Sequence, residues 1–151
     1  MQPNCASRPP SGADRLATDR LRLHASPHKT HEEAWFLLQT RWMLYMEEGN
    51  TLKLLRGIPR KWLEPGQHIG LERVASYFGP LSLTVESDLC HDRIVAEIVC
   101  EGERRPAVVD LRLPHPQGRR PEWVRGAIYD PAKETARITG FSGRGQVVLG
   151  F

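Results

Sequence analysis

The hydrophobic pattern changes once along the chain. Between residues 34 and 46 apolar side chains dominate, and only Gln39, Thr40 and Arg41 interrupt them. On a helical wheel these apolar residues cover nearly the whole circumference, which predicts a helix that is buried on all sides. After Gly49 the period shortens from about 3.6 residues to about 2, which is typical of half-buried strands. The pattern therefore predicts one apolar helix followed by a β-rich region.

The start of this helix carries a cap signal. The four residues from Thr30 to Glu33 (THEE) fit a capping box, with Thr30 as the N-cap and the Glu33 side chain reaching back from position N3. Gly49 suits the C′ position, where a left-handed backbone ends many helices. We therefore expect one long helix of the buried type over residues 30–48.

Short runs with strand-like composition fill the rest of the chain. They are residues 51–55, 69–75, 81–87, 94–100, 108–113, 124–129, 135–139 and 147–151. Turn signals separate them at residues 79–80, 116–118, 130–131 and 142–143, and residues 58–63 fit a compact turn or a single helical turn. Short strands at this spacing favour an antiparallel β-sandwich over residues 49–151.

The first 29 residues differ in character from the rest of the chain. Their first half is rich in Pro, Ser, Gly and Asn, and they hold too few apolar residues to fold alone. We expect a flexible arm over residues 1–29. The predicted fold class is therefore mainly β: an antiparallel sandwich preceded by one long helix and a flexible N-terminal arm.

Composition and charge exclude several classes of protein. The chain has 151 residues, of which 40% are hydrophobic and 26% charged, as in a globular domain. The net charge is only +3, and the basic residues stand in scattered groups of two or three, which argues against a nucleic-acid partner. No apolar run is long enough to span a membrane, and the N-terminus lacks the apolar segment of a signal peptide. We expect no membrane partner, and the compartment stays open because a longer parent protein could carry its own signal.

The cysteines and histidines give no strong metal or redox signal. No C-x-x-C pair occurs; Cys90 and Cys100 could pair across neighbouring strands or remain free thiols. His24, His28 and His31 have a loose spacing that could hold a metal, but nothing fixes their geometry before the helix begins. We therefore predict neither a metal nor a cofactor.

The junction after the helix resembles that of a known enzyme group. The run LLRGIPRKWL at residues 54–63 resembles the passage by which bacterial six-hairpin (α/α)6-barrel glycoside hydrolases lead from the last barrel helix into a C-terminal β-sandwich. The run ASYFGPLS at residues 75–82 is similar to the first sandwich hairpin of that group. The resemblance covers residues 24–151. It implies that the apolar helix is surrounded by other barrel helices, and that most of the barrel, with its catalytic acid, lies upstream of Met1.

The resemblance also implies a candidate site at the start of the helix. Inverting glycosidases use two carboxylic groups, one as acid and one as base. The family pattern makes Glu32 the candidate base, with Glu33 as a second catalytic candidate, His31 as a hydrogen-bonding neighbour and Trp35 as a surface for stacking a sugar. A structural interpretation is stronger: capping accounts for Glu33, and acidic residues in a first turn suit the helix dipole. One carboxylate without its partner predicts negligible turnover in isolation.

Other sequence features have two interpretations each. Four aromatic residues could form a carbohydrate platform, but packing in the core or between domains fits each of them better: Trp62, Tyr77, Phe78 and Trp123. The acidic pair at residues 47–48 could be functional, solvated or paired with Arg. The run SGRG at residues 142–145 lacks the Lys-Ser/Thr of a P-loop, so a hairpin turn fits it better.

The sequence supports three hypotheses for function. The first is a C-terminal fragment or accessory domain of a glycoside hydrolase, non-catalytic alone, that supports a carbohydrate-active barrel. The second is a stand-alone β-sandwich module that binds carbohydrate or protein. The third is an autonomous enzyme that uses a metal held by the His-rich arm. The expected partners are a carbohydrate or the upstream barrel, with a homo-oligomer through the apolar helix as a further option.

Overall fold

The computed structural model describes residues 29–151. The predicted arm lies outside the described residues except for Lys29. The chain divides into two units between Leu38 and Gln39, and the β-sandwich belongs to the second. No helix among the described residues has the length and apolar character needed to cross a membrane.

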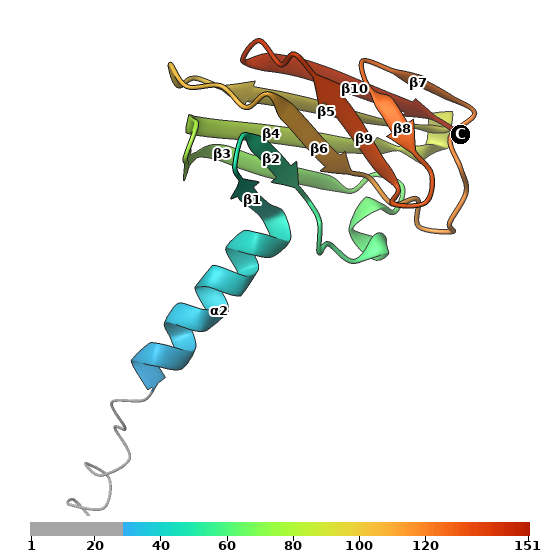
Figure 1. Ribbon diagram of the computed structural model, residues 1–151. Coiled ribbons are helices and arrows are strands. Elements are labelled where there is room, and N and C mark those ends of the chain that lie inside the picture. Colours follow the sequence, from blue (N-terminus) through green and yellow to red (C-terminus); the bar gives the residue numbers. More distant parts are fainter. Residues whose placement is uncertain (1–28) are drawn as a thin grey trace, which may run out of the picture. The chain divides into compact units, whose positions relative to one another are not determined.

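The sandwich consists of two five-stranded sheets, which lie one over the other in Figure 1. The first sheet, in spatial order, contains β1 (Tyr45–Glu48), β2 (Thr51–Leu54), β6 (Val108–Arg112), β9 (Thr135–Thr139) and β8 (Ile128–Asp130). The second contains β3 (His68–Ser76), β4 (Gly79–Asp88), β5 (Arg93–Cys100), β10 (Arg144–Gly150) and β7 (Trp123–Arg125). All neighbouring strands are antiparallel except β2 and β6. The predicted mainly β sandwich is confirmed.

The core lies between the sheets because each strand turns alternate residues inward. In β5 every second residue from Ile94 to Cys100 is buried, and in the facing sheet Leu52 and Leu111 have no exposed surface. Burial of each such aliphatic side chain stabilises the fold by about 1.5–3 kcal/mol. From the described part of α2, only Met43 and Leu44 pack against this core. The sandwich therefore has a hydrophobic core that is almost entirely its own.

The helix α2 spans Lys29–Leu44 and differs from the prediction at both ends. It begins one residue before the predicted cap, so Thr30 is a helical residue and the proposed capping box is wrong. It also ends four residues early, because Tyr45–Glu48 pairs as β1 with β2. Gly49 has the expected positive φ of 59°, but it forms the turn of this hairpin and not the end of the helix.

Two predictions in the β region need correction. Residues 124–129 are not one strand: β7 pairs with β10 in one sheet, β8 pairs with β9 in the other, and Gly126 with a φ of 83° lies between them. The turn expected at residues 79–80 falls two residues earlier, because Gly79 already pairs with Ser76. The single helical turn expected at residues 58–63 is confirmed as a 3-10 helix, Arg60–Leu63.

Candidate functional site

The residues predicted to form the site lie in the first two turns of α2. His31, Glu32, Glu33 and Trp35 are all exposed there. Trp35 Nε1 donates a hydrogen bond of 3.0 Å to Nε2 of His31, one helical turn away, and the two rings meet edge to face at 6.3 Å. Because Nε2 accepts this bond, a neutral His31 carries its proton on Nδ1. The structure thus brings His31 and Trp35 together on one side of the helix.

The two carboxylates in this first turn are less well placed for joint chemistry. Glu32 and Glu33 line a shallow hollow of about 470 Å³ together with Phe36 and Leu37. Adjacent helical residues point about 100° apart, so the two side chains do not face each other. They cannot flank one sugar as the acid and base of a glycosidase. A catalytic role for either residue stays a prediction, and it would need a second carboxylate from elsewhere.

The predicted metal alternative falls mainly outside the described residues. His24 and His28 lie there, and His31 already accepts the hydrogen bond from Trp35. Within residues 29–151 no group of three or more potential metal-binding side chains of His, Cys, Asp or Glu is found. The two described cysteines are free: Cys90 is exposed, and Cys100 is buried with a thiol pKa raised by burial to about 11.

The four aromatic candidates do not form one platform. Phe78 is fully buried in the core, so the packing interpretation is correct for it. Trp62 lies beside the start of β3, in a hollow that includes His68, whereas Tyr77 follows the far end of the same strand. Trp123 is exposed on β7 and lies against Gly150 of the adjacent strand. The three exposed rings are therefore separate surface features.

The acidic pair at residues 47–48 is held by basic side chains. Both oxygens of Glu47 accept hydrogen bonds from Arg41, at 2.9 and 2.8 Å, and Oε1 also accepts one from the Tyr77 backbone N–H at 2.9 Å. Glu48 pairs with Lys53 on the next strand. The Arg-paired interpretation is correct for Glu47. This contact joins the last turn of α2, the β1–β2 hairpin and the β3–β4 turn.

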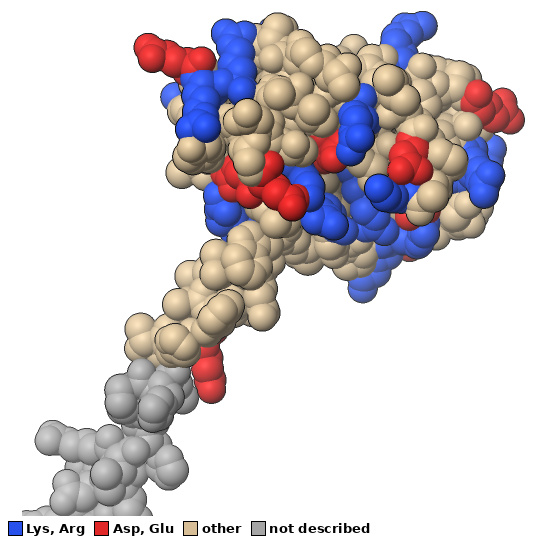
Figure 2. All heavy atoms as spheres, viewed as in Figure 1, with Lys and Arg blue, Asp and Glu red and all other residues tan. Residues whose placement is uncertain are grey.

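A polar concavity lies on the outer face of the first sheet. It is a groove of about 670 Å³. Its floor includes Lys53, Asp110 and Arg137, which the strand register places in one row across β2, β6 and β9. Asp110 accepts two hydrogen bonds from Arg137, at 2.7 and 3.0 Å. Figure 2 shows both basic and acidic groups on the visible surface of the sandwich, with red and blue groups side by side. We call this concavity the sheet groove.

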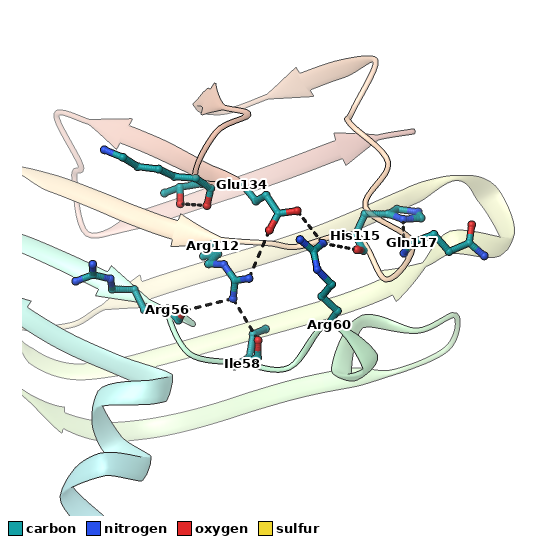
Figure 3. A network of polar contacts seen from close by, with 9 residues as sticks. Arg56, Ile58, Arg60, Arg112, His115, Gln117 and Glu134 are labelled. Carbon is teal, nitrogen blue, oxygen red and sulfur yellow. Dashed lines mark hydrogen bonds and ion pairs between the residues drawn. The ribbon is translucent and has the colours of Figure 1, made fainter.

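A network of polar contacts fixes one end of the sheet groove (Figure 3). Arg112 donates hydrogen bonds to the backbone carbonyls of Arg56 and Ile58, at 3.3 and 3.2 Å, and contacts Glu134 at 3.4 Å. The same carboxylate forms an ion pair of 2.7 Å with Arg60. The network therefore ties the loop between β2 and β3 to the ends of β6 and β9. Two of its hydrogen-bond acceptors are backbone carbonyls, which every residue has, so the sequence gives no sign of this network.

His115 completes this network on the side of the core. Arg60 donates a 2.8 Å hydrogen bond to the His115 carbonyl, and the Gln117 backbone N–H donates to His115 Nδ1 at 3.1 Å. The imidazole is only 5% exposed and packs 4.5 Å from the ring of Phe151. Burial lowers the pKa of His115, and the nearby charge of Arg119 lowers it further. This arrangement is that of a neutral packing residue and not of a proton donor open to solvent.

Sequence reasoning missed the sheet groove because its residues come from distant strands. The available signal was the outward position of charged residues in strands with alternating burial, such as Lys53 in β2 and Asp110 in β6. No protein-family model matches the chain, and neither the curated proteins nor the solved structures contain a match. The indications of function therefore come from the chain's own residues and geometry.

Proposed function

We propose that this chain is a non-catalytic accessory domain of a carbohydrate-active enzyme, in which α2 packs among the helices of an (α/α)6 barrel. The observation that carries the proposal is the exposure of large apolar side chains along α2. Leu37 is 67% exposed and Trp42 is 42% exposed, and Trp35 and Phe36 are exposed as well. Exposed apolar surface of this extent on one element is typical of an interaction surface.

The hydrophobic pattern of α2 supports helices as the partner. A helix that is apolar all round is stable in water only when neighbours cover several of its sides. Met43 and Leu44, in the last turn of the helix, pack against the sandwich core as partly buried residues. The resemblance of residues 54–63 to a barrel–sandwich junction supplies the kind of neighbour: a ring of helices. A stand-alone binding module remains the alternative, and the exposed Trp62 and Trp123 favour it as sugar-stacking surfaces.

The behaviour of the full chain in solution tests the exposed helix. We expect concentration-dependent self-association in sedimentation velocity, because without its barrel the apolar surface of α2 finds a second copy. Leu37→Lys should weaken this association at least tenfold. Ile128→Lys is the matched control for self-association, since Ile128 is a 70% exposed aliphatic residue on the sandwich and its replacement should leave the association unchanged. A wild-type chain that stays monomeric at high concentration would contradict the proposal.

Assays with aryl glycosides test the non-catalytic part of the proposal. We expect no turnover above background from the full chain, because Glu32 and Glu33 do not face each other as an acid–base pair. Turnover that disappears in Glu32→Gln would show that the chain is an enzyme by itself. The coding sequence upstream of Met1 gives a separate test, since an in-frame barrel there is the expected result and an unrelated in-frame domain would contradict it.

A further inference from the structure

The charges of the sheet groove are paired, with one exception. Three of its basic residues each pair with one carboxylate inside the groove: Lys53 with Glu48, Arg137 with Asp110, and Lys133 with Asp130 at 4.0 Å. Arg112 pairs with Glu134 at the end of the groove, and it shares this carboxylate with Arg60. The fifth cation is Arg56, and among the described residues no ion pair or hydrogen bond involves its guanidinium. Among the described residues that line the sheet groove, Arg56 is therefore the cation without a paired carboxylate.

The position of Arg56 suits a ligand contact. Its backbone carbonyl is fixed by Arg112, while its side chain is exposed and points away from the other labelled residues in Figure 3. A guanidinium offers five N–H donors in a planar fork, a shape that matches a carboxylate or a sulfate. Arg56 thus combines a fixed backbone with a free anion-binding group at the edge of a concave surface.

The rest of the sheet groove suits a ligand rich in hydroxyl groups. The pairs Arg137–Asp110 and Lys53–Glu48 present donors and acceptors side by side, as neutral hydroxyls require. Ile128 adds an exposed apolar surface at one side. The volume of about 670 Å³ lies within the range of about 300–1,000 Å³ that is usual for ligand sites.

The same charges argue against a polyanion. Three carboxylates line the sheet groove, those of Glu48, Asp110 and Asp130, and they would repel a chain of phosphates. One unpaired cation among paired ones fits one anionic group among neutral polar ones. The chemistry that matches this pattern is an acidic sugar within an otherwise neutral oligosaccharide.

We propose that the sheet groove binds an anionic oligosaccharide, with Arg56 holding its carboxylate or sulfate group and the paired side chains of the floor binding its hydroxyls. The choice of a carbohydrate rests on the proposed function, whereas the preference for an anionic one comes from Arg56 and its surroundings. The site would give the accessory domain a ligand of its own, separate from the surface of α2.

Isothermal titration of the full chain tests this proposal with four probes. An oligogalacturonide supplies carboxylates, a sulfated galactan oligomer supplies sulfates, a neutral cello-oligosaccharide lacks charge, and inorganic sulfate lacks the sugar. We expect saturable binding of one or both charged oligosaccharides, at least tenfold weaker binding of the neutral one, and weakening of the charged ones in 0.5 M salt. Equal binding of the neutral oligosaccharide, or equally tight binding of inorganic sulfate, would overturn the proposal.

A matched pair of variants identifies the anchor. Arg56→Gln should weaken binding of the charged oligosaccharide about tenfold or more, the usual worth of a charge-assisted bidentate contact. The variant should fold normally because only the backbone of Arg56 takes part in the network. Arg144→Gln, at an exposed cation on β10 in the other sheet, should bind like the wild type. Unchanged affinity in Arg56→Gln would refute the assignment of the anchor.

The results separate this proposal from the proposed function. Self-association through Leu37 together with no oligosaccharide binding would leave the accessory domain standing and reject the groove. Binding that depends on Arg56 in a chain that is monomeric at all concentrations would retain the groove and favour the stand-alone module.

Discussion

Gly126 lies where the chain passes from β7 in one sheet to β8 in the other, and we expect its replacement by alanine to be unusually costly. Its φ of 83° is in the left-handed region that side chains with a Cβ rarely adopt. A Cβ built there would overlap the backbone carbonyl of Gln146 on β10. Since β7 pairs with β10 just before this point, the overlap cannot be relieved without disturbing that pairing.

The cost has two parts that can be measured separately. The left-handed backbone disfavours alanine by about 1–2 kcal/mol, less about 0.4–1 kcal/mol gained because alanine restricts the unfolded chain. Overlap with a backbone atom adds about 1–3 kcal/mol, as for other overpacked sites. We therefore expect Gly126→Ala to lower the free energy of unfolding by about 3 kcal/mol.

Gly118→Ala supplies the matched control. Its φ of 71° is similar, but an added Cβ meets nothing within 4 Å. Only the backbone part should remain, about 1 kcal/mol or less. Urea unfolding of the full chain, extrapolated linearly to water, measures both losses, and similar m-values would show that the transitions are comparable. Equal losses in Gly126→Ala and Gly118→Ala would refute the idea that close approach of β10 controls the crossing between the sheets.

Two further predictions concern titratable groups. Because burial lowers the pKa of His115 in the folded protein, the unfolded chain binds a proton at this residue more tightly. The free energy of unfolding should therefore fall as the pH drops from about 7 to 5, through the unfolded pKa near 6.5. In urea titrations at several pH values, His115→Gln should make this dependence on pH less steep. In a Cys5→Ser variant, a thiol reagent at pH 8 should modify Cys90 rapidly and Cys100 only after denaturant is added. The reason is that Cys100 is buried and its thiol pKa is about 11. Equally fast modification of both thiols in the native protein would contradict the buried position of Cys100.

Local sequence patterns predicted most elements but not the end of the helix. Residues 45 and 46 are apolar and continue the helical pattern, so nothing local separates them from α2. Strand pairing determines where the helix ends: Tyr45 lies opposite Leu54 and Glu48 opposite Thr51 in a hairpin whose turn contains Gly49. That pairing satisfies the backbone groups and places Glu47 where Arg41 and the Tyr77 N–H bind it. A longer helix and the β1–β2 hairpin differ in their contacts with distant residues, and the periodicity of the sequence carries no information about such contacts.

The division of residues 124–129 has a similar cause. The run is uniformly strand-like, and its one glycine is compatible with a bulge as well as with a change of sheet. The division between the two sheets follows from the pairing: Val124 pairs with Leu149 on β10, whereas Tyr129 pairs with Ala136 on β9. Only the completed sandwich brings both partners within reach of one short segment.

The sheet groove could not be predicted from the sequence because it depends on the parallel pairing of β2 with β6. Lys53 and Asp110 become neighbours only when β2 lies beside β6, and residues of the other sheet separate these strands in the sequence. Arg137 then joins the row through β9. The predicted site on α2 is different in kind, since His31 and Trp35 lie one turn apart and their contact follows from helical spacing alone.

The rigidity of the sheet groove bears on what it can bind. Arg112 is held by two backbone carbonyls and by Glu134, so the loop that carries Arg56 is fixed before any ligand arrives. When a ligand binds, only the side chain of Arg56 has to become ordered, because the loop that carries it is already fixed. The entropic cost of binding is therefore low. Surface ion pairs add little to stability, so the pairs along the floor are better explained by the donors and acceptors they present. A preformed row of polar pairs with one unpaired cation has the properties of a recognition surface.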